Sequence, residues 1–370
     1  MRWVMILGAT SLISAGCSPP SSVPSKMPAA NLQSTHELEA GLTGIIPPLL
    51  EEHNVPGASV AVLVDREIVL VRGYGRLRAD EASPSVDEHT VFQAASLSKP
   101  VVAYGVHRLF AERPEDIDLD RPLAEYRPPD EPYRHDDPRL ERITARMVLS
   151  HTTGFPNWRP GDSSDNPKPL KIKFEPGSRF QYSGEGYVYL QRVVEQITRE
   201  TLDVYLRRSV LEPLNMRDSS FVWEERFEAV HAKPHDSKGR PKDKWRPRAA
   251  LAAGTLHTTA MDYARFLQAV LGDGPSGEGA EPWLAQVSTI DDSLGWSLGW
   301  GIENVEDGDL FWQWGDDGPF KALAAGSQTG GVAVVVFTNG QRGLNVARPV
   351  IDWILGPGLR FLDFRMLSYR

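Results

Sequence analysis

The chain has 370 residues, of which 41% are hydrophobic and 24% are charged. This composition is that of a folded globular protein and excludes collagen-like, disordered and coiled-coil chains, while the length predicts one large or two interleaved domains. The formal net charge of −9 makes binding to a nucleic-acid backbone unfavourable, so no nucleic-acid partner is expected. The single cysteine, Cys17, has no partner for an intramolecular disulfide and cannot build a thiolate metal centre.

The residues before Cys17 have the pattern of a bacterial lipoprotein signal. Met1-Arg2 gives a positive start, an almost uncharged stretch follows, and Ser14-Ala15-Gly16 places small residues directly before the cysteine. The stretch is too short for a permanent membrane span. We therefore predict a signal peptide over 1–17 and lipid attachment at Cys17. An ordinary cleaved signal or a buried N-terminal helix are the alternatives.

The next segment predicts where the folded domain begins. Residues 18–34 are rich in Ser and Pro, which favours a flexible tether, and residues 35–370 then form the domain. An exported protein with this layout would be held in the cell envelope, on the periplasmic side of a bacterial membrane, by its N-terminal lipid.

The N-terminal part of the domain predicts a helix and a hairpin. The spacing of apolar residues predicts a helix over 35–53, kinked or split at Pro47-Pro48. The apolar runs 58–64 and 68–74, joined by a short charged turn, predict two paired strands.

Helical spacing then dominates the middle of the chain, and strand patterns return near its end. Predicted helices cover 101–111, 143–149, 186–197, 202–211 and 260–271, and predicted strands cover 296–302, 310–314, 321–325 and 332–338, before a last helix over 347–355. Strands at both ends predict an α/β (α+β) fold: one antiparallel sheet formed from both termini and flanked by helices, with a mainly helical insert at about 100–250.

A serine and a lysine three residues apart are the first candidates for chemistry. Ser96 and Lys99 lie in Phe92–Lys99, at a predicted strand-to-helix transition, where a helix would place both on one face. A serine hydroxyl needs a neighbouring base to become a nucleophile, and a partly desolvated lysine amine can serve as one. A Ser and a Lys at this spacing also arise by chance in a chain of this length.

Two further segments hold candidate residues. Tyr182 follows a turn and precedes the helix over 186–197, where a nearby positive charge such as Lys99 would lower its pKa. Packing is the alternative role for this tyrosine. Phe311–Ala322 reads as a strand, a Gly-rich turn and a second strand, which is either a hairpin with surface aromatics or the edge of a substrate cleft.

In this order, the three segments resemble the penicillin-recognising serine hydrolases, and most closely the class C β-lactamase branch with its D,D-peptidase and esterase relatives. Shorter segments support the resemblance from about Leu38 to the C-terminus, among them Leu149–Gly154, Leu211–Met216 and Ala253–Leu256. The resemblance implies a β-lactamase/transpeptidase-like fold and a serine hydrolase that needs neither a cofactor nor a metal.

The resemblance also implies roles for individual residues. Ser96 matches the nucleophile, Lys99 its activating partner, and Tyr182 the tyrosine that acts as general acid and base. The backbone N–H groups of Ser96 and Asp316 match the oxyanion hole. Which of Lys99 and Tyr182 is the base stays open, because strongly coupled groups titrate together.

Two departures from the family pattern bear on the substrate. Gly184 stands where the second motif commonly has Asn, and Gln313 stands where the third motif, continued here by Trp314 and Gly315, commonly has Lys or His. A neutral side chain cannot attract a substrate carboxylate as a cation does. We therefore expect an ester or neutral amide substrate to be favoured over β-lactams.

Three alternatives remain. In the first, the protein is a true class C-like β-lactamase or D,D-peptidase. In the second, it is a non-catalytic lipoprotein that binds peptidoglycan fragments or a partner protein, and in the third, His151 or His257 belongs to a Ser-His-Asp triad. For both histidines, structural hydrogen bonding is the expectation.

Overall fold

The computed structural model describes residues 34–80, 82–114, 118–129, 137–159, 170–272, 274, 283–305 and 308–367. The predicted signal peptide, the lipid attachment at Cys17 and all of the predicted tether except Ser34 lie outside the described residues. In these ranges, no helix combines the length and the apolar character needed to cross a membrane.

The centre of the molecule is one antiparallel sheet of eight strands in the order β2-β1-β10-β9-β8-β7-β6-β5. Its strands are β1 (Gly57–Val64), β2 (Glu67–Gly75), β5 (Ser288–Thr289), β6 (Leu294–Trp296), β7 (Gly301–Glu303), β8 (Leu310–Asp317), β9 (Phe320–Ser327) and β10 (Val332–Thr338). The N-terminal β1 pairs with the C-terminal β10, with Ala58 opposite Thr338. The prediction of one antiparallel sheet built from both ends of the chain is confirmed.

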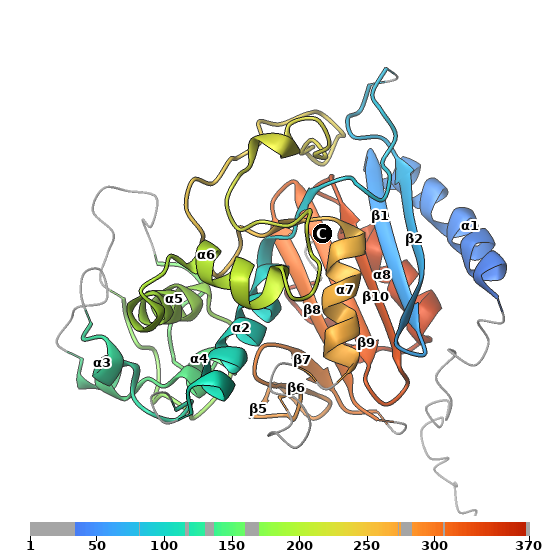
Figure 1. The fold of residues 1–370 in the computed structure, drawn as a ribbon. Coiled ribbons are helices and arrows are strands. Elements are labelled where there is room, and N and C mark those ends of the chain that lie inside the picture. The colour runs from blue at the N-terminus through green and yellow to red at the C-terminus, as the bar shows by residue number, and fades with distance from the viewer. Residues whose placement is uncertain are drawn as a thin grey trace, which may run out of the picture.

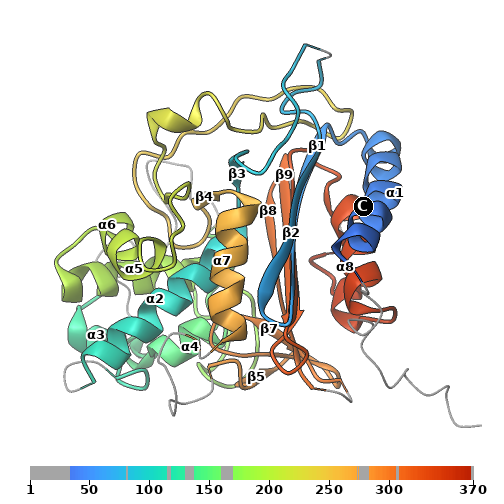
Figure 2. The same ribbon diagram turned by 45° about the vertical axis from the view of Figure 1, so that its right-hand side comes forward.

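Helices cover both faces of this sheet. Helices α1 (Thr35–His53) and α8 (Leu344–Leu355) pack on one face, and α7 (Ala260–Leu271) lies on the other, as Figure 2 shows with the sheet nearly edge-on. Alternate residues of β1 separate the two layers: Val60 and Val62 face the α1 and α8 side, whereas Ala61 and Leu63 face the α7 side. This is the two-residue period of a strand buried on both faces.

A helical region lies beside the α7 face of the sheet (Figure 1). It consists of α2 (Ser98–Glu112), α3 (Leu123–Tyr126), α4 (Ala145–Leu149), α5 (Gly184–Thr198) and α6 (Leu202–Leu206). From residue 212 to residue 256 the chain has no α-helix and returns over the top of this region as a long loop, which ends at β4 (His257–Thr258). The short β4 pairs with β3 (Phe92–Gln93), which ends three residues before the predicted nucleophile, Ser96.

Three predicted elements differ from the structure. The predicted strand over 296–302 is two strands, β6 and β7, because the chain turns between Ser297 and Trp300, and Gly299 adopts the positive φ that this turn uses. The predicted helix over 202–211 is α6 followed by a wider π-helical turn. Helix α1 is not split: it continues through Pro47 and Pro48, both of which are exposed.

Candidate active site

Ser96 lies in a tight turn between β3 and α2. The preceding residue, Ala95, has a φ of +49°, a left-handed conformation that residues with a Cβ adopt only at a cost. The hydroxyl of Ser98 donates to the Ala95 carbonyl at 2.6 Å and accepts from the Leu256 N–H at 3.0 Å. The loop before β4 therefore stabilises the turn through Leu256. Ser96 itself is partly exposed at the start of α2.

Lys99 lies one helical turn after Ser96 and is 1% exposed. Its Nζ is 3.0 Å from the Oγ of Ser96 and 2.8 Å from the carbonyl oxygen of Ala253. Burial disfavours the charged amine and lowers the pKa of Lys99 to about 7. A large fraction of the amine is therefore neutral near pH 7 and can accept a proton from the serine.

Tyr182 lies two residues before α5, with its ring centroid 4.9 Å from the Nζ of Lys99. The ring packs against Trp314, with 4.7 Å between centroids, and against His151, with 4.3 Å between centroids. Burial raises the pKa of Tyr182, and hydrogen bonds with Ser96 and Gln313 oppose this shift only in part. The expectation that Lys99 lowers this pKa is therefore wrong: the phenol stays neutral and can donate a proton.

Gln313 on β8 is completely buried. Its Nε2 donates to the hydroxyl of Tyr182 at 2.9 Å and to the carbonyl oxygen of Ser96 at 3.2 Å. Gln313, which stands where the third motif commonly has Lys or His, therefore connects the turn that carries Ser96 to Tyr182.

The end of β8 passes very close to the nucleophile turn. A Cβ built on Gly315 would lie 2.3 Å from the carbonyl oxygen of Ala94, so only glycine allows this approach. The next residue, Asp316, lies at the cavity described below, and its carboxylate pairs with Lys321. Ser96 and Asp316 are thereby brought to the same place from distant parts of the sequence.

A cavity of about 330 Å³ opens in front of Ser96. It is lined by Ala95, Ser96, Asn157, Trp158, Tyr182, Trp245, Leu251, Ala253, Gly254, Trp314, Asp316, Asp317 and Met366. Five of these, Asn157, Trp158, Trp245, Leu251 and Met366, were not predicted from the sequence; Met366 belongs to the C-terminal turn formed by residues 360–367. They come from loops and from the C-terminal turn, and no motif marks them.

Gly184 lies behind the wall of this cavity. A Cβ on Gly184 would lie 2.8 Å from the ring of Trp158, and its N–H donates to the Oδ1 of Asn157 at 2.9 Å. Asn157 and Trp158 therefore form the wall where the family pattern commonly has an asparagine.

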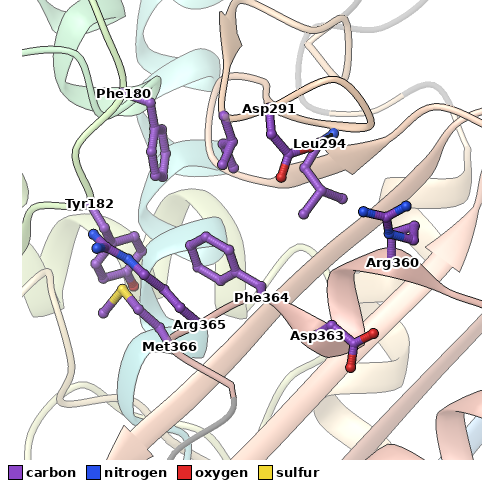
Figure 3. Close-up of a pocket in the computed structure, with 10 residues that line it drawn as sticks. Phe180, Tyr182, Asp291, Leu294, Arg360, Asp363, Phe364, Arg365 and Met366 are labelled. Carbon is purple, nitrogen blue, oxygen red and sulfur yellow. Dashed lines mark hydrogen bonds between the residues drawn. The ribbon is translucent and has the colours of Figure 1, made fainter.

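A second cavity, of about 520 Å³, adjoins the first and shares Tyr182 and Met366 with it. Its other lining residues are Phe180, Ile290, Asp291, Leu294, Arg360, Asp363, Phe364 and Arg365. Figure 3 shows the side chains of Arg365 and Met366 next to Tyr182. The C-terminal turn thus forms one side of the second cavity and reaches Tyr182.

The two histidines have structural partners. The Nδ1 of His151 accepts from the N–H of Ser183 at 3.1 Å, and burial keeps the pKa of His151 well below its ordinary value. His257 contacts the carbonyl of Thr255 and the Nζ of Lys244. Over the described ranges, no group of three or more His, Cys, Asp or Glu side chains is placed to hold a metal ion.

A partly exposed serine, a buried lysine and a neutral tyrosine, gathered beside strand β8 of an antiparallel sheet, are the groups that a serine hydrolase of the acyl-transfer class needs. The model of the beta-lactamase family matches residues 42–354, and the chain belongs to this family. The resemblance inferred from the three segments is confirmed.

Curated relatives of this chain carry different names. It is 32% identical to Esterase EstB of Burkholderia gladioli over 229 residues, which cover 55% of this chain and 56% of the esterase. The chain therefore spans little more than half of that protein. It is 28% identical to Penicillin-binding protein 4 of Amycolatopsis lactamdurans over 334 residues, which cover 79% of this chain and 83% of the relative.

Solved structures show the same fold. The beta-lactamase/D-alanine carboxypeptidase of Pseudomonas syringae has a TM-score of 0.73 at 15% identity, covering 86% of this chain and 98% of that one. The octameric penicillin-binding protein homologue of Pyrococcus abyssi has a TM-score of 0.69 at 20% identity, covering 87% of this chain and 78% of that one. At these identities the likeness establishes the fold alone.

Proposed function

We propose that the protein hydrolyses ester or amide bonds through an acyl-enzyme on Ser96, with ester or neutral amide substrates favoured over β-lactams. The observation that carries this proposal is the 3.0 Å contact between the Oγ of Ser96 and the Nζ of Lys99, whose pKa burial lowers to about 7. A weak nucleophile and a base suited to neutral pH are thereby in direct contact.

The arrangement supports a division of roles between Lys99 and Tyr182. Neutral Lys99 takes the proton of Ser96 as the serine oxygen attacks the substrate carbonyl. The N–H groups of Ser96 and Asp316 stabilise the resulting oxyanion. Tyr182 gives its proton to the leaving group as the carbonyl–leaving-group bond breaks, and the proton on Lys99 restores the phenol. Water then attacks the acyl-enzyme and releases the acid and free Ser96.

The position of the proton donor also predicts where the two halves of the substrate lie. Ser96 and Asp316 line the 330 Å³ cavity, whereas Tyr182 lines both cavities, so a leaving group that faces Tyr182 and points away from Ser96 extends into the 520 Å³ cavity. The acyl group then lies in the 330 Å³ cavity, against Trp158 and Trp245.

Two observations favour an ester or neutral amide over a β-lactam. Gln313 is uncharged and is occupied with Tyr182 and Ser96, so the third motif supplies no cation for a substrate carboxylate. A lost charge-assisted hydrogen bond of this kind costs roughly 1.5 to 3 kcal/mol. In addition, the relative from Burkholderia gladioli is named an esterase.

The test compares p-nitrophenyl butyrate with nitrocefin on the same preparation. We expect kcat/KM for the ester to exceed that for nitrocefin by at least about tenfold, and Ser96→Ala to abolish both while leaving the thermal unfolding transition in place. A fluorophosphonate probe should label Ser96. Equal turnover of the two substrates would instead support the β-lactamase alternative, and release of D-alanine from a peptide would support the D,D-peptidase alternative. An unlabelled, inactive protein that binds peptidoglycan fragments would support the non-catalytic alternative.

A further inference from the structure

Lys244 is a buried lysine outside the proposed catalytic group. It lies in the long loop before β4 and is 8% exposed. Its Nζ is 2.8 Å from each of three acceptors, the Oε1 of Gln93, the carbonyl oxygen of Trp245 and the Nε2 of His257. The protonated amine has three N–H donors, each with an acceptor here, and the neutral amine keeps two donors, so Lys244 can donate to Gln93 in either form.

These contacts fix the orientation of the Gln93 amide. The Nδ1 of His257 lies 2.9 Å from the carbonyl oxygen of Thr255, so Nδ1 carries the proton and Nε2 accepts from Lys244. Because the Oε1 of Gln93 faces Lys244, its Nε2 faces the other way and donates to the carboxylate of Asp317.

The bond between Gln93 and Asp317 joins the two segments that carry the proposed oxyanion-hole donors. Gln93 on β3 lies three residues before Ser96, and Asp317 follows Asp316 at the end of β8. The distance between the N–H groups of Ser96 and Asp316 therefore depends on how these segments are held together. An oxyanion hole acts only when its donors are placed in advance of the reaction.

We propose that Lys244 is a positioning residue. Through Gln93 and Asp317, it keeps the two oxyanion-hole donors, the N–H groups of Ser96 and Asp316, at the distance that the reaction needs. This role rests on the function proposed above. Without the Lys244 amine, the amide oxygen of Gln93 loses the donor that faces it, and the Nε2 bond to Asp317 alone orients the amide, so Gln93 holds Asp317 less firmly.

The surroundings of Lys244 disfavour the charged form of its amine. The pKa of Lys244 is lowered to about 7, chiefly by burial and also by Arg246 and Lys233, while Asp317 opposes this shift. His257 also faces it, with a pKa held well below its ordinary value by burial and by Lys244 itself. A methionine of similar length would avoid this desolvation.

Lys244→Met removes the donor and keeps most of the volume. We expect its kcat for p-nitrophenyl butyrate to fall about tenfold to a hundredfold, with KM changed less than threefold, since a misplaced oxyanion donor affects the transition state more than substrate binding. The matched control is Lys242→Met, two residues away in the same loop and exposed, which should keep the wild-type kcat.

Gln93→Leu tests whether Lys244 acts through Gln93. It also replaces Lys244→Met as the test if that variant fails to fold. It should lower kcat as Lys244→Met does, and the double variant should lose no more than Gln93→Leu alone, because Lys244 acts on Asp317 only through Gln93. Additive losses would show that Lys244 acts on catalysis by another route and would overturn the proposal.

Amide hydrogen exchange provides a readout that does not require turnover. Exchange over residues 314–318 should be faster in Lys244→Met and Gln93→Leu than in the wild type or Lys242→Met. Unchanged exchange, or a kcat for Lys244→Met within threefold of the wild type, would overturn the role of Lys244 and leave the proposed function intact. A wild-type protein that hydrolyses no ester or amide would overturn both.

Discussion

The base at Ser96 must be neutral to act, and this sets the pH dependence of the reaction. Burial lowers the pKa of Lys99 to about 7, while the nearby His151 is held well below its ordinary value and Tyr182 well above its own. We therefore expect kcat/KM for a neutral ester to rise with pH up to about 7 and to fall about tenfold per pH unit below it. Rates should be followed at the isosbestic point of the product. A profile that stays flat down to pH 5.5 would contradict Lys99 as the base.

At the scale of residues, the sequence predicted which candidate groups lie together better than it predicted their surroundings. The spacing of Ser96 and Lys99 is local, so a helical turn alone predicts their contact, which the structure places at 3.0 Å. The raised pKa of Tyr182 and the contacts of Gln313 depend on burial by β8, more than a hundred residues away from Tyr182 along the chain. Such long-range effects leave no signal in a local pattern.

At the scale of elements, the close approach of β8 to the nucleophile turn is the most specific requirement. In Gly315→Ala the new Cβ would lie 2.3 Å from the carbonyl oxygen of Ala94, so the strand must move away from the turn. We expect kcat to fall by at least about tenfold, as misplacement of an oxyanion donor does. The control is Gly44→Ala in α1, where a Cβ meets no atom within 4 Å.

The measurement for this variant is kcat together with the thermal unfolding transition. Gly44→Ala should keep the activity and should be slightly stabilised, because alanine favours a helix interior over glycine by about 1 kcal/mol. A fully active Gly315→Ala protein would show that the end of β8 is free to move without affecting the reaction.

Elements with a strong apolar period were predicted well, and elements defined by turns were not. The pair β1 and β2 and helix α7 have clear patterns and lie close to their predicted ranges. The turn that separates β6 from β7 lies within an apolar stretch and depends on the positive φ of Gly299. The walls formed by Trp158 and Trp245 come from loops, where aromatic residues carry no period.

At the scale of the whole molecule, the proposed site depends on segments from nearly every part of the chain. The nucleophile turn follows β3, Tyr182 lies two residues before α5, β8 belongs to the sheet, and the C-terminal turn reaches the cavity at Met366. The order of segments along the sequence allowed the family to be identified before the fold was known. It did not predict the second cavity, because that cavity exists only where the C-terminal turn meets the residues around Leu294.

The two buried lysines predict how the stability of the whole molecule changes with pH. Burial lowers the pKa of Lys99 and of Lys244 from 10.5 to about 7, so between these values the unfolded chain binds protons that the folded protein does not. The free energy of unfolding therefore rises with pH across this window, by up to about 1.4 kcal/mol per pH unit for each lysine. Above about pH 10, the raised pKa values of Tyr182 and Tyr263 oppose the rise, because the unfolded tyrosines lose protons first.

Urea unfolding between pH 7.5 and 9.5 measures this slope in a range where the carboxylates and histidines no longer titrate. Lys99→Met and Lys244→Met should each reduce the slope, and the double variant should remove most of it. Lys242→Met, in which an exposed lysine is replaced, should keep the wild-type slope. If the wild-type free energy of unfolding is constant or falls over this range, the two amines are charged in the folded protein, and Lys99 then cannot be the base that takes the proton of Ser96.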